Sequence, residues 1–177
     1  MNPMDPSQPA ARPRLLIRVL AGLQVGVTGG LWMLLWFAVH SLVLGQRWYA
    51  VPNLLGSTFF GDHAFRSGAG WVTASGFALH VLASGCVGVL FGLVAPASAV
   101  LSGLRAFLLG LLAGVLWYYV LFEPFWKIVN PWVPLYSSHR TMVVAHLIYG
   151  AWLARWRRAA MAIQGQIGED RAPDGTP

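Results

Sequence analysis

The chain has 177 residues, of which 56% are hydrophobic and only 10% are charged. A soluble domain carries roughly 25% charged residues, so this chain has too few charges to cover a water-facing surface, and its excess apolar surface is expected to face lipid. The net charge of +6 does not indicate a nucleic-acid-binding protein, because the basic residues lie at the chain ends and beside or between the apolar stretches without forming a continuous basic face.

Four apolar stretches predict an all-α polytopic membrane protein with a transmembrane domain over residues 15–158. Residues 1–14 are polar and rich in proline, which predicts a disordered tail, and residues 159–177 predict a second one. The expected transmembrane helices cover about 15–43, 72–94, 102–122 and 138–156. The last stretch is short for a bilayer, and it would cross if its flanking arginines snorkel to the interface.

Two connections between these helices are rich in aromatic residues. The first covers about 45–71 and the second about 123–139. Trp and Tyr prefer the headgroup layer, so both segments are expected to lie on or dip into the outer interface. Prolines exclude a long continuous helix from the second connection, and they are Pro124, Pro131 and Pro134.

The basic residues predict the orientation of the chain. One side of a four-helix chain carries Arg12, Arg14, Arg18, Arg105, Arg155, Arg157 and Arg158. The opposite side carries only Arg47, Arg66, Lys127 and Arg140. Because cytoplasmic segments are enriched in Lys and Arg, both termini are expected in the cytoplasm.

Small residues recur at every fourth position of the predicted helices. This spacing places them on one helix face, where they let neighbouring backbones approach closely. The glycines expected to pack helices are Gly22, Gly26, Gly30, Gly88, Gly92, Gly110, Gly114 and Gly150. The pattern is also the basis for a hypothesis of two tandem copies, each a helix, an aromatic outer loop and a returning helix.

Two histidines fall into this small-residue pattern and are candidate ligand-binding residues. His80 precedes Ser84 by four positions, and His146 precedes Gly150 by four. Ionisable groups within a membrane are costly and are functional candidates for that reason. The simplest interpretation is that each imidazole hydrogen-bonds a neighbouring helix. The alternatives are a b-type haem ligated by both rings, a proton relay and a small-molecule site.

A second group of candidate ligand-binding residues lies in or beside the second aromatic connection. It comprises Glu123, His139 and Arg140, with Asp62 and His63 in the first connection. These residues would form a metal or anion site if the connections brought them together. Their spacing matches no metal-binding signature, so interfacial anchoring is the favoured interpretation and no metal or other cofactor is assigned. The single cysteine, Cys86, is expected to be a small buried residue.

The glycine-rich helices with a histidine in the outer half resemble a broad group of uncharacterised bacterial four-helix inner-membrane proteins. The residues that carry the resemblance are Leu79-His80-Val81 and Ala145-His146-Leu147-Ile148-Tyr149-Gly150. It covers about residues 15–156 and implies a location in the bacterial inner membrane, with no assigned activity.

Three functions remain open from the sequence. The first is a non-enzymatic structural or accessory membrane protein, which predicts a homo-oligomer or a membrane-protein partner. The second is a bundle that binds a cofactor or small molecule through His80 and His146. The third is a small channel or transporter with its mouth at the outer loops. No Asp or Glu lies inside a predicted helix, which argues against cation-coupled transport through buried carboxylates.

Overall fold

The computed structural model describes residues 11–95 and 103–169, and the regular structure in these ranges is helical. The elements in chain order are α1 (Ala11–Val43), α2 (Ala50–Phe60), α3 (His63–Arg66), α4 (Trp71–Val94), α5 (Gly103–Leu116), the π-helical turn η1 (Trp117–Phe122), α6 (Glu123–Val129), α7 (Trp132–Tyr136), α8 (His139–Leu153) and α9 (Trp156–Glu169). Three helical stretches are long and apolar enough to span a membrane, namely Arg14–Val43, Trp71–Val94 and Gly103–Val129. The predicted all-α class is therefore confirmed.

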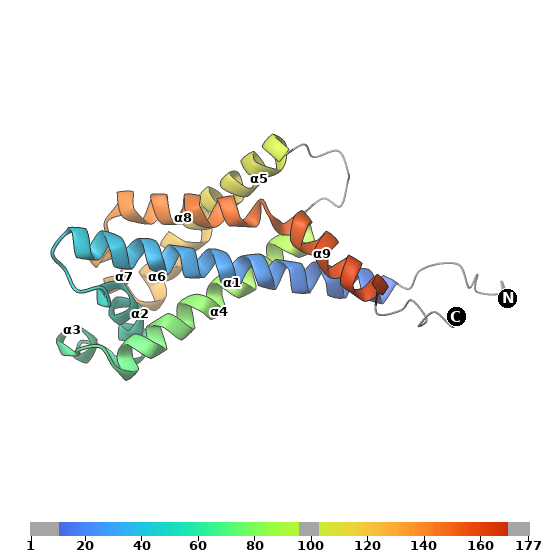
Figure 1. Ribbon diagram of the computed structural model, residues 1–177. Helices are drawn as coiled ribbons and strands as arrows, with labels where there is room; N and C mark the ends of the chain where they lie inside the picture. Colours follow the sequence, from blue (N-terminus) through green and yellow to red (C-terminus); the bar gives the residue numbers. More distant parts are fainter. Residues whose placement is uncertain (1–10, 96–102, 170–177) are drawn as a thin grey trace, which may run out of the picture.

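The four longest apolar helices are α1, α4, α5 and α8, and they form an open arc with α1 and α8 in the middle (Figure 1). Helix α1 packs along α4 on one side and along α8 on another, and α5 packs against α8. Within the described ranges, α4 and α5 make no extended contact with each other. The order in space is therefore α4, α1, α8, α5, and the side between α4 and α5 is left open.

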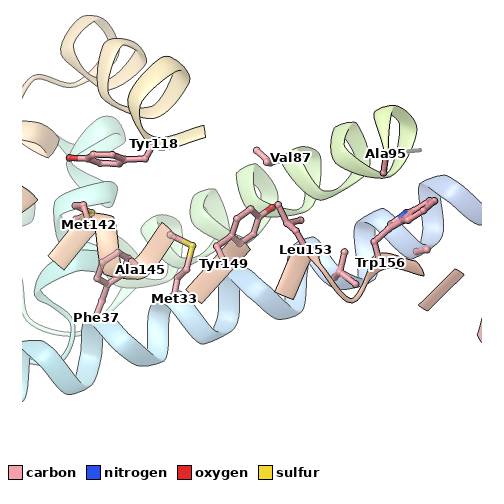
Figure 2. Close-up of a cluster of buried hydrophobic side chains, with 12 residues drawn as sticks. Met33, Phe37, Val87, Ala95, Tyr118, Met142, Ala145, Tyr149, Leu153 and Trp156 are labelled. Carbon is pink, nitrogen blue, oxygen red and sulfur yellow. The ribbon is translucent and has the colours of Figure 1, made fainter. Parts of the chain in front are cut away.

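The main buried cluster lies where α1, α4 and α8 meet (Figure 2). It includes Met33 and Phe37 from α1, and Val87 from α4. Tyr149 and Leu153 join it from α8, each with 1% of its surface exposed. Because these large side chains come from three helices, the cluster determines how α8 sits against the other two.

Glycines allow the closest helix crossings. A Cβ atom at Gly26 would lie 2.5 Å from the Ser84 carbonyl oxygen and 2.8 Å from the Gly88 Cα atom. Gly114 of α5 lies in the same way against the His146 carbonyl oxygen and Gly150 of α8. Any side chain at these glycines would collide with backbone, which cannot move aside as a side chain can.

The crossings bear on the hypothesis of two tandem copies. Gly26 of α1 faces the Ser84 carbonyl oxygen, and Gly110 of α5 faces the Gly150 carbonyl oxygen. Ser84 comes four residues after His80, and Gly150 comes four residues after His146. These contacts are compatible with two copies, and the duplication stays a prediction.

The two aromatic connections fold into short helices that cover one end of the arc, which we call the capped end. Leu54 and Leu55 of α2 pack there against Trp126 of α6 and Val133 of α7. Figure 1 shows α2, α3 and α7 at this end and α9 at the other. The prolines do exclude one long helix from the second connection, but α6 and α7 form on either side of Asn130.

Two buried asparagines hold the capped end together. Asn130 donates from Nδ2 to Ser57 Oγ at 2.8 Å and to Thr58 Oγ1 at 3.0 Å, which joins the second connection to the first. Asn53 accepts from Thr73 Oγ1 at 2.6 Å, which joins α2 to the start of α4. Buried polar groups are stable only when they are paired, so these bonds specify one arrangement of the short helices.

Helix α9 covers all of the described part of the predicted C-terminal tail. The sequence predicts a disordered tail from residue 159, whereas α9 runs through Trp156–Glu169 and packs against α1. Its apolar residues Ala159, Ala160 and Ile163 share one face and lie against the main buried cluster. Helical spacing of a few small apolar residues gives only a weak signal in a polar segment, and tertiary contact makes the helix stable. At the other terminus α1 begins at Ala11, and residues 1–10 of the predicted tail lie outside the described residues.

Arg18 joins three helices at the end opposite the cap. Its guanidinium donates to the Gly92 carbonyl at 3.0 Å, to the Leu93 carbonyl at 2.7 Å and to the Ala95 carbonyl at 2.5 Å. These carbonyls belong to the last turn of α4 and the residue that follows it, where intrahelical partners are lacking. The same guanidinium lies 5.5 Å from the ring centroid of Trp156 in α9.

Candidate functional site

A largely apolar cavity of about 270 Å³ lies among α4, η1, α6 and α8. Leu79 and Val87 of α4 form one wall, and Trp117 and Phe122 of η1 form another. No Asp, Glu, Lys or Arg is among the described residues that line it. The cavity lies on the side of the arc that α4 and α5 leave open, and His80 and His146 both line it.

His146 is held in one tautomer by its own helix. The ring is 1% exposed, and Nδ1 lies 2.7 Å from the Met142 carbonyl oxygen. A carbonyl oxygen only accepts, so Nδ1 carries the proton and Nε2 is an acceptor. The rings of Tyr118 and Phe122 pack against the imidazole, each with its centroid 4.9 Å away. These contacts fix the orientation of the ring.

His80 is held in the other tautomer by α1. Its Nε2 lies 3.1 Å from the Gly30 carbonyl oxygen, so Nε2 carries the proton and Nδ1 is an acceptor. Neither acceptor nitrogen has a protein hydrogen-bond partner among the described residues. Both residues line the cavity, and each keeps one ring nitrogen that can accept a hydrogen bond.

The π-helical turn positions the aromatic wall. The N–H of Glu123 donates to the carbonyl of Tyr118, five residues earlier. Pro124 lacks an N–H for the carbonyl of Val120 and would clash with it in a regular α-helix, and the wider turn relieves that clash. Such turns are rare and occur often at functional sites. The run of aromatics before Pro124 is the only sequence signal that could have pointed to this wall.

Glu123, His139 and Arg140, the second group of candidate residues, do not come together as one site at the cavity. His139 is bound through Nδ1 to the Tyr118 hydroxyl at 2.8 Å and through Nε2 to the Tyr119 hydroxyl at 3.1 Å. Glu123 pairs with Lys127 at 3.0 Å, and Arg140 is exposed at the start of α8. His139 therefore ties η1 to α8, which is a positioning contact.

The first connection adds no metal ligands to this group. Asp62 pairs with Arg66 at 2.6 Å, and His63 is exposed. Within residues 11–95 and 103–169, no three His, Cys, Asp or Glu side chains gather closely enough to hold a metal ion.

The histidine geometry does not fit a haem held by two Nε2 atoms. His146 has its Nε2 available, but His80 uses its Nε2 to donate to the Gly30 carbonyl. Ligation by both rings would require His80 to break this bond and turn over between α4 and α1. The residues present therefore do not favour the haem alternative.

Cys86 differs from the sequence expectation. It is exposed rather than buried, and it lines the cavity. In the described ranges α1 is the long helix that packs along α4, so residues on the open side of α4 stay exposed.

Comparison with protein families, with curated proteins and with solved structures finds no match for this chain. The fold itself defines a class, a helical protein with three helices compatible with membrane insertion.

Proposed function

We propose that this protein is a four-span integral membrane protein that binds a small lipid-soluble molecule in the cavity between His80 and His146. The observation that carries the proposal is an apolar cavity of about 270 Å³ with two imidazole acceptors at its wall. Small-molecule sites are typically apolar pockets in which a few polar groups fix the orientation of the ligand. Among the three functions left open by the sequence, this geometry favours a binding protein.

Contacts along α1 support a fourth span built from α8 and the start of α9. Thr141 of α8 contacts His40 at 3.1 Å, and Trp156 of α9 donates to the Arg18 carbonyl at 3.4 Å. The 22 residue steps of α1 from 18 to 40 correspond to about 33 Å, close to the thickness of the hydrocarbon layer. Helix α8 by itself has 15 residues, which is too short to span the layer.

The distribution of arginines supports an orientation with both termini in the cytoplasm of a bacterial inner membrane. Arg14, Arg18 and Arg155 lie at the end opposite the cap, together with Arg157 and Arg158. Cytoplasmic ends of membrane helices are enriched in such residues. The capped end then faces outward, and its exposed aromatics lie at the outer interface, among them Trp48, Phe65, Trp71 and Tyr136.

The open side of the arc supports entry of the ligand from the bilayer. Helices α4 and α5 do not pack along each other in the described ranges, and the cavity lies between α4 and the turn that follows α5. Leu90 and Cys86 line the cavity and are also exposed on the outer surface of α4. A molecule dissolved in lipid could therefore reach the cavity without crossing water.

A binding measurement with 4-bromophenol tests the proposal. Bromine quenches indole fluorescence on contact, and Trp117 and Trp126 line the cavity. Protein in lipid nanodiscs is expected to show saturable quenching. Ala83→Trp should abolish the saturable component because the new ring fills the cavity, whereas Ala78→Trp, on the lipid-facing groove of the same helix, should retain it. Linear quenching that is equal in all three proteins would contradict binding in this cavity.

A further inference from the structure

We propose that the molecule bound in this cavity is a lipid-soluble ring compound that carries a hydroxyl group, of the phenol or hydroquinone class. This inference rests on the binding function proposed above and specifies its ligand. It follows from the hydrogen-bonding state of the two histidines, the absence of charge on the walls and the aromatic residues of η1 and α6.

The two tautomers require a hydrogen-bond donor on the ligand. The Nε2–H of His80 donates a hydrogen bond to the Gly30 carbonyl, and the Nδ1–H of His146 donates one to the Met142 carbonyl. Each ring is left with one acceptor nitrogen, and both residues line the cavity. An acceptor in an apolar site is stabilised by a donor and is left unpaired by a group that can only accept.

Tyr149, another polar side chain at the wall, leaves the two imidazoles as the acceptors for a ligand. The Tyr149 hydroxyl already donates to the Ser84 carbonyl at 2.5 Å, so it does not compete for the imidazoles. Trp117 and Trp126 line the cavity with largely apolar rings. A hydroxyl group on a neutral ring can donate to either imidazole.

The walls favour a neutral, flat molecule. No charged side chain lines the cavity within the described ranges, so a charged ligand would be desolvated without compensation. Trp117, Phe122 and Trp126 offer ring faces and edges for aromatic contact. An apolar cavity of about 150 Å³ is known to hold benzene, so about 270 Å³ accommodates a ring with substituents.

The test compares 4-bromophenol with 4-bromoanisole in the nanodisc quenching assay. The two probes share the ring and the bromine, but the methyl ether cannot donate. We expect the phenol to bind about five- to tenfold more tightly than the ether, as one hydrogen bond in an apolar site predicts. Equal affinity for the two probes would overturn the hydroxyl inference and leave the binding function standing. Saturable binding of neither probe would overturn both proposals.

Variants of the two cavity histidines test whether the imidazoles cause the preference for the phenol over the ether. His146→Phe and His80→Phe are each expected to reduce the ratio of phenol to ether affinity towards one while the ether still binds. His40→Phe is the matched control, because His40 bonds Thr141 at the capped end and does not line the cavity. Retention of the full ratio in both cavity variants would overturn the role of the imidazoles. If a variant fails to fold, the comparison of the two probes on the unmodified protein still decides the proposal.

Discussion

Two backbone carbonyls determine which ring nitrogens of His80 and His146 can accept a hydrogen bond. The carbonyl of Gly30 lies opposite His80, and the carbonyl of Met142 lies opposite His146. Each carbonyl accepts a hydrogen bond from one ring N–H and so determines which nitrogen is left to accept. The two histidines are alike in the sequence, yet different ring nitrogens remain as acceptors because the N–H groups donate to different helices.

At the residue scale, the crossing glycines give the sharpest stability prediction. Gly26→Ala places a Cβ 2.5 Å from the Ser84 carbonyl oxygen, so α1 and α4 must separate. We expect a loss of about 1–3 kcal/mol, as for other overpacked cores. The measurement is the free energy of unfolding in detergent, followed by circular dichroism.

Gly165→Ala in α9 is the matched control for that substitution. No atom lies within 4 Å of a Cβ at this glycine, and alanine is the better helix former by about 1 kcal/mol. This variant should be as stable as the original protein or slightly more stable. Equal stability of the two alanine variants would mean that the α1–α4 crossing is looser than the contacts at Gly26 indicate.

At the scale of elements, the π-helical turn connects helix geometry to the cavity. Pro124→Ala restores an N–H that can donate to the Val120 carbonyl, so the turn is expected to relax towards a regular α-helix. Tyr118 and Phe122 would then rotate away from His146. We expect affinity for 4-bromophenol to fall severalfold without loss of thermal stability. Pro134→Ala in α7, away from the cavity wall, should leave affinity unchanged.

Arg18 provides a second prediction at this scale. Its guanidinium bonds three carbonyls at the C-terminal end of α4, and hydrogen bonds to charged groups contribute about 1.5–3 kcal/mol each where they are well formed. Arg18→Gln should therefore lower the unfolding midpoint in detergent clearly. Arg14→Gln, four residues earlier and exposed, should change it little. Similar midpoints for the two variants would show that Arg18 does not hold α4.

The buried asparagines predict how the capped end behaves as a unit. Asn130→Ala removes the bonds to Ser57 and Thr58 and leaves the buried Ser57 hydroxyl and the half-buried Thr58 hydroxyl with fewer partners. We expect a loss of about 1–3 kcal/mol and faster amide hydrogen exchange in α2 and α7. Unchanged exchange in α2 would mean that the apolar contacts of Leu54 and Leu55 are sufficient to hold this end together.

At the scale of the whole molecule, the four-span arrangement is tested by labelling single cysteines in intact cells. The background variant is Cys86→Ala. A membrane-impermeant maleimide should label Ala69→Cys, beside α3 at the capped end, and should not label Gln164→Cys in α9 before lysis. Labelling of both from outside would indicate that α8 does not cross the membrane. Labelling of Gln164→Cys alone would reverse the proposed orientation.

Hydropathy and small-residue spacing were sufficient to predict the class and the long helices. The prediction of a helix over about 72–94 agrees with α4 at Trp71–Val94, and that over about 15–43 agrees with the apolar part of α1. These features depend on the local sequence, because apolar length and composition determine whether a segment is stable in lipid. His80 and His146 also stood out in sequence, because a polar residue within an apolar stretch is costly.

Only the tertiary structure decided how these parts form a site. The crossing register, the π-helical turn before Pro124 and the helix at the C-terminal end all depend on contacts between residues far apart in the chain. The cavity depends on an arrangement in which α4 and α5 remain apart. Its hydrogen-bonding chemistry depends on backbone carbonyls that accept from the ring N–H groups of the two histidines. The sequence determined which segments are helical and apolar, because these are local properties. The cavity and its chemistry are properties of packing, which local sequence does not specify.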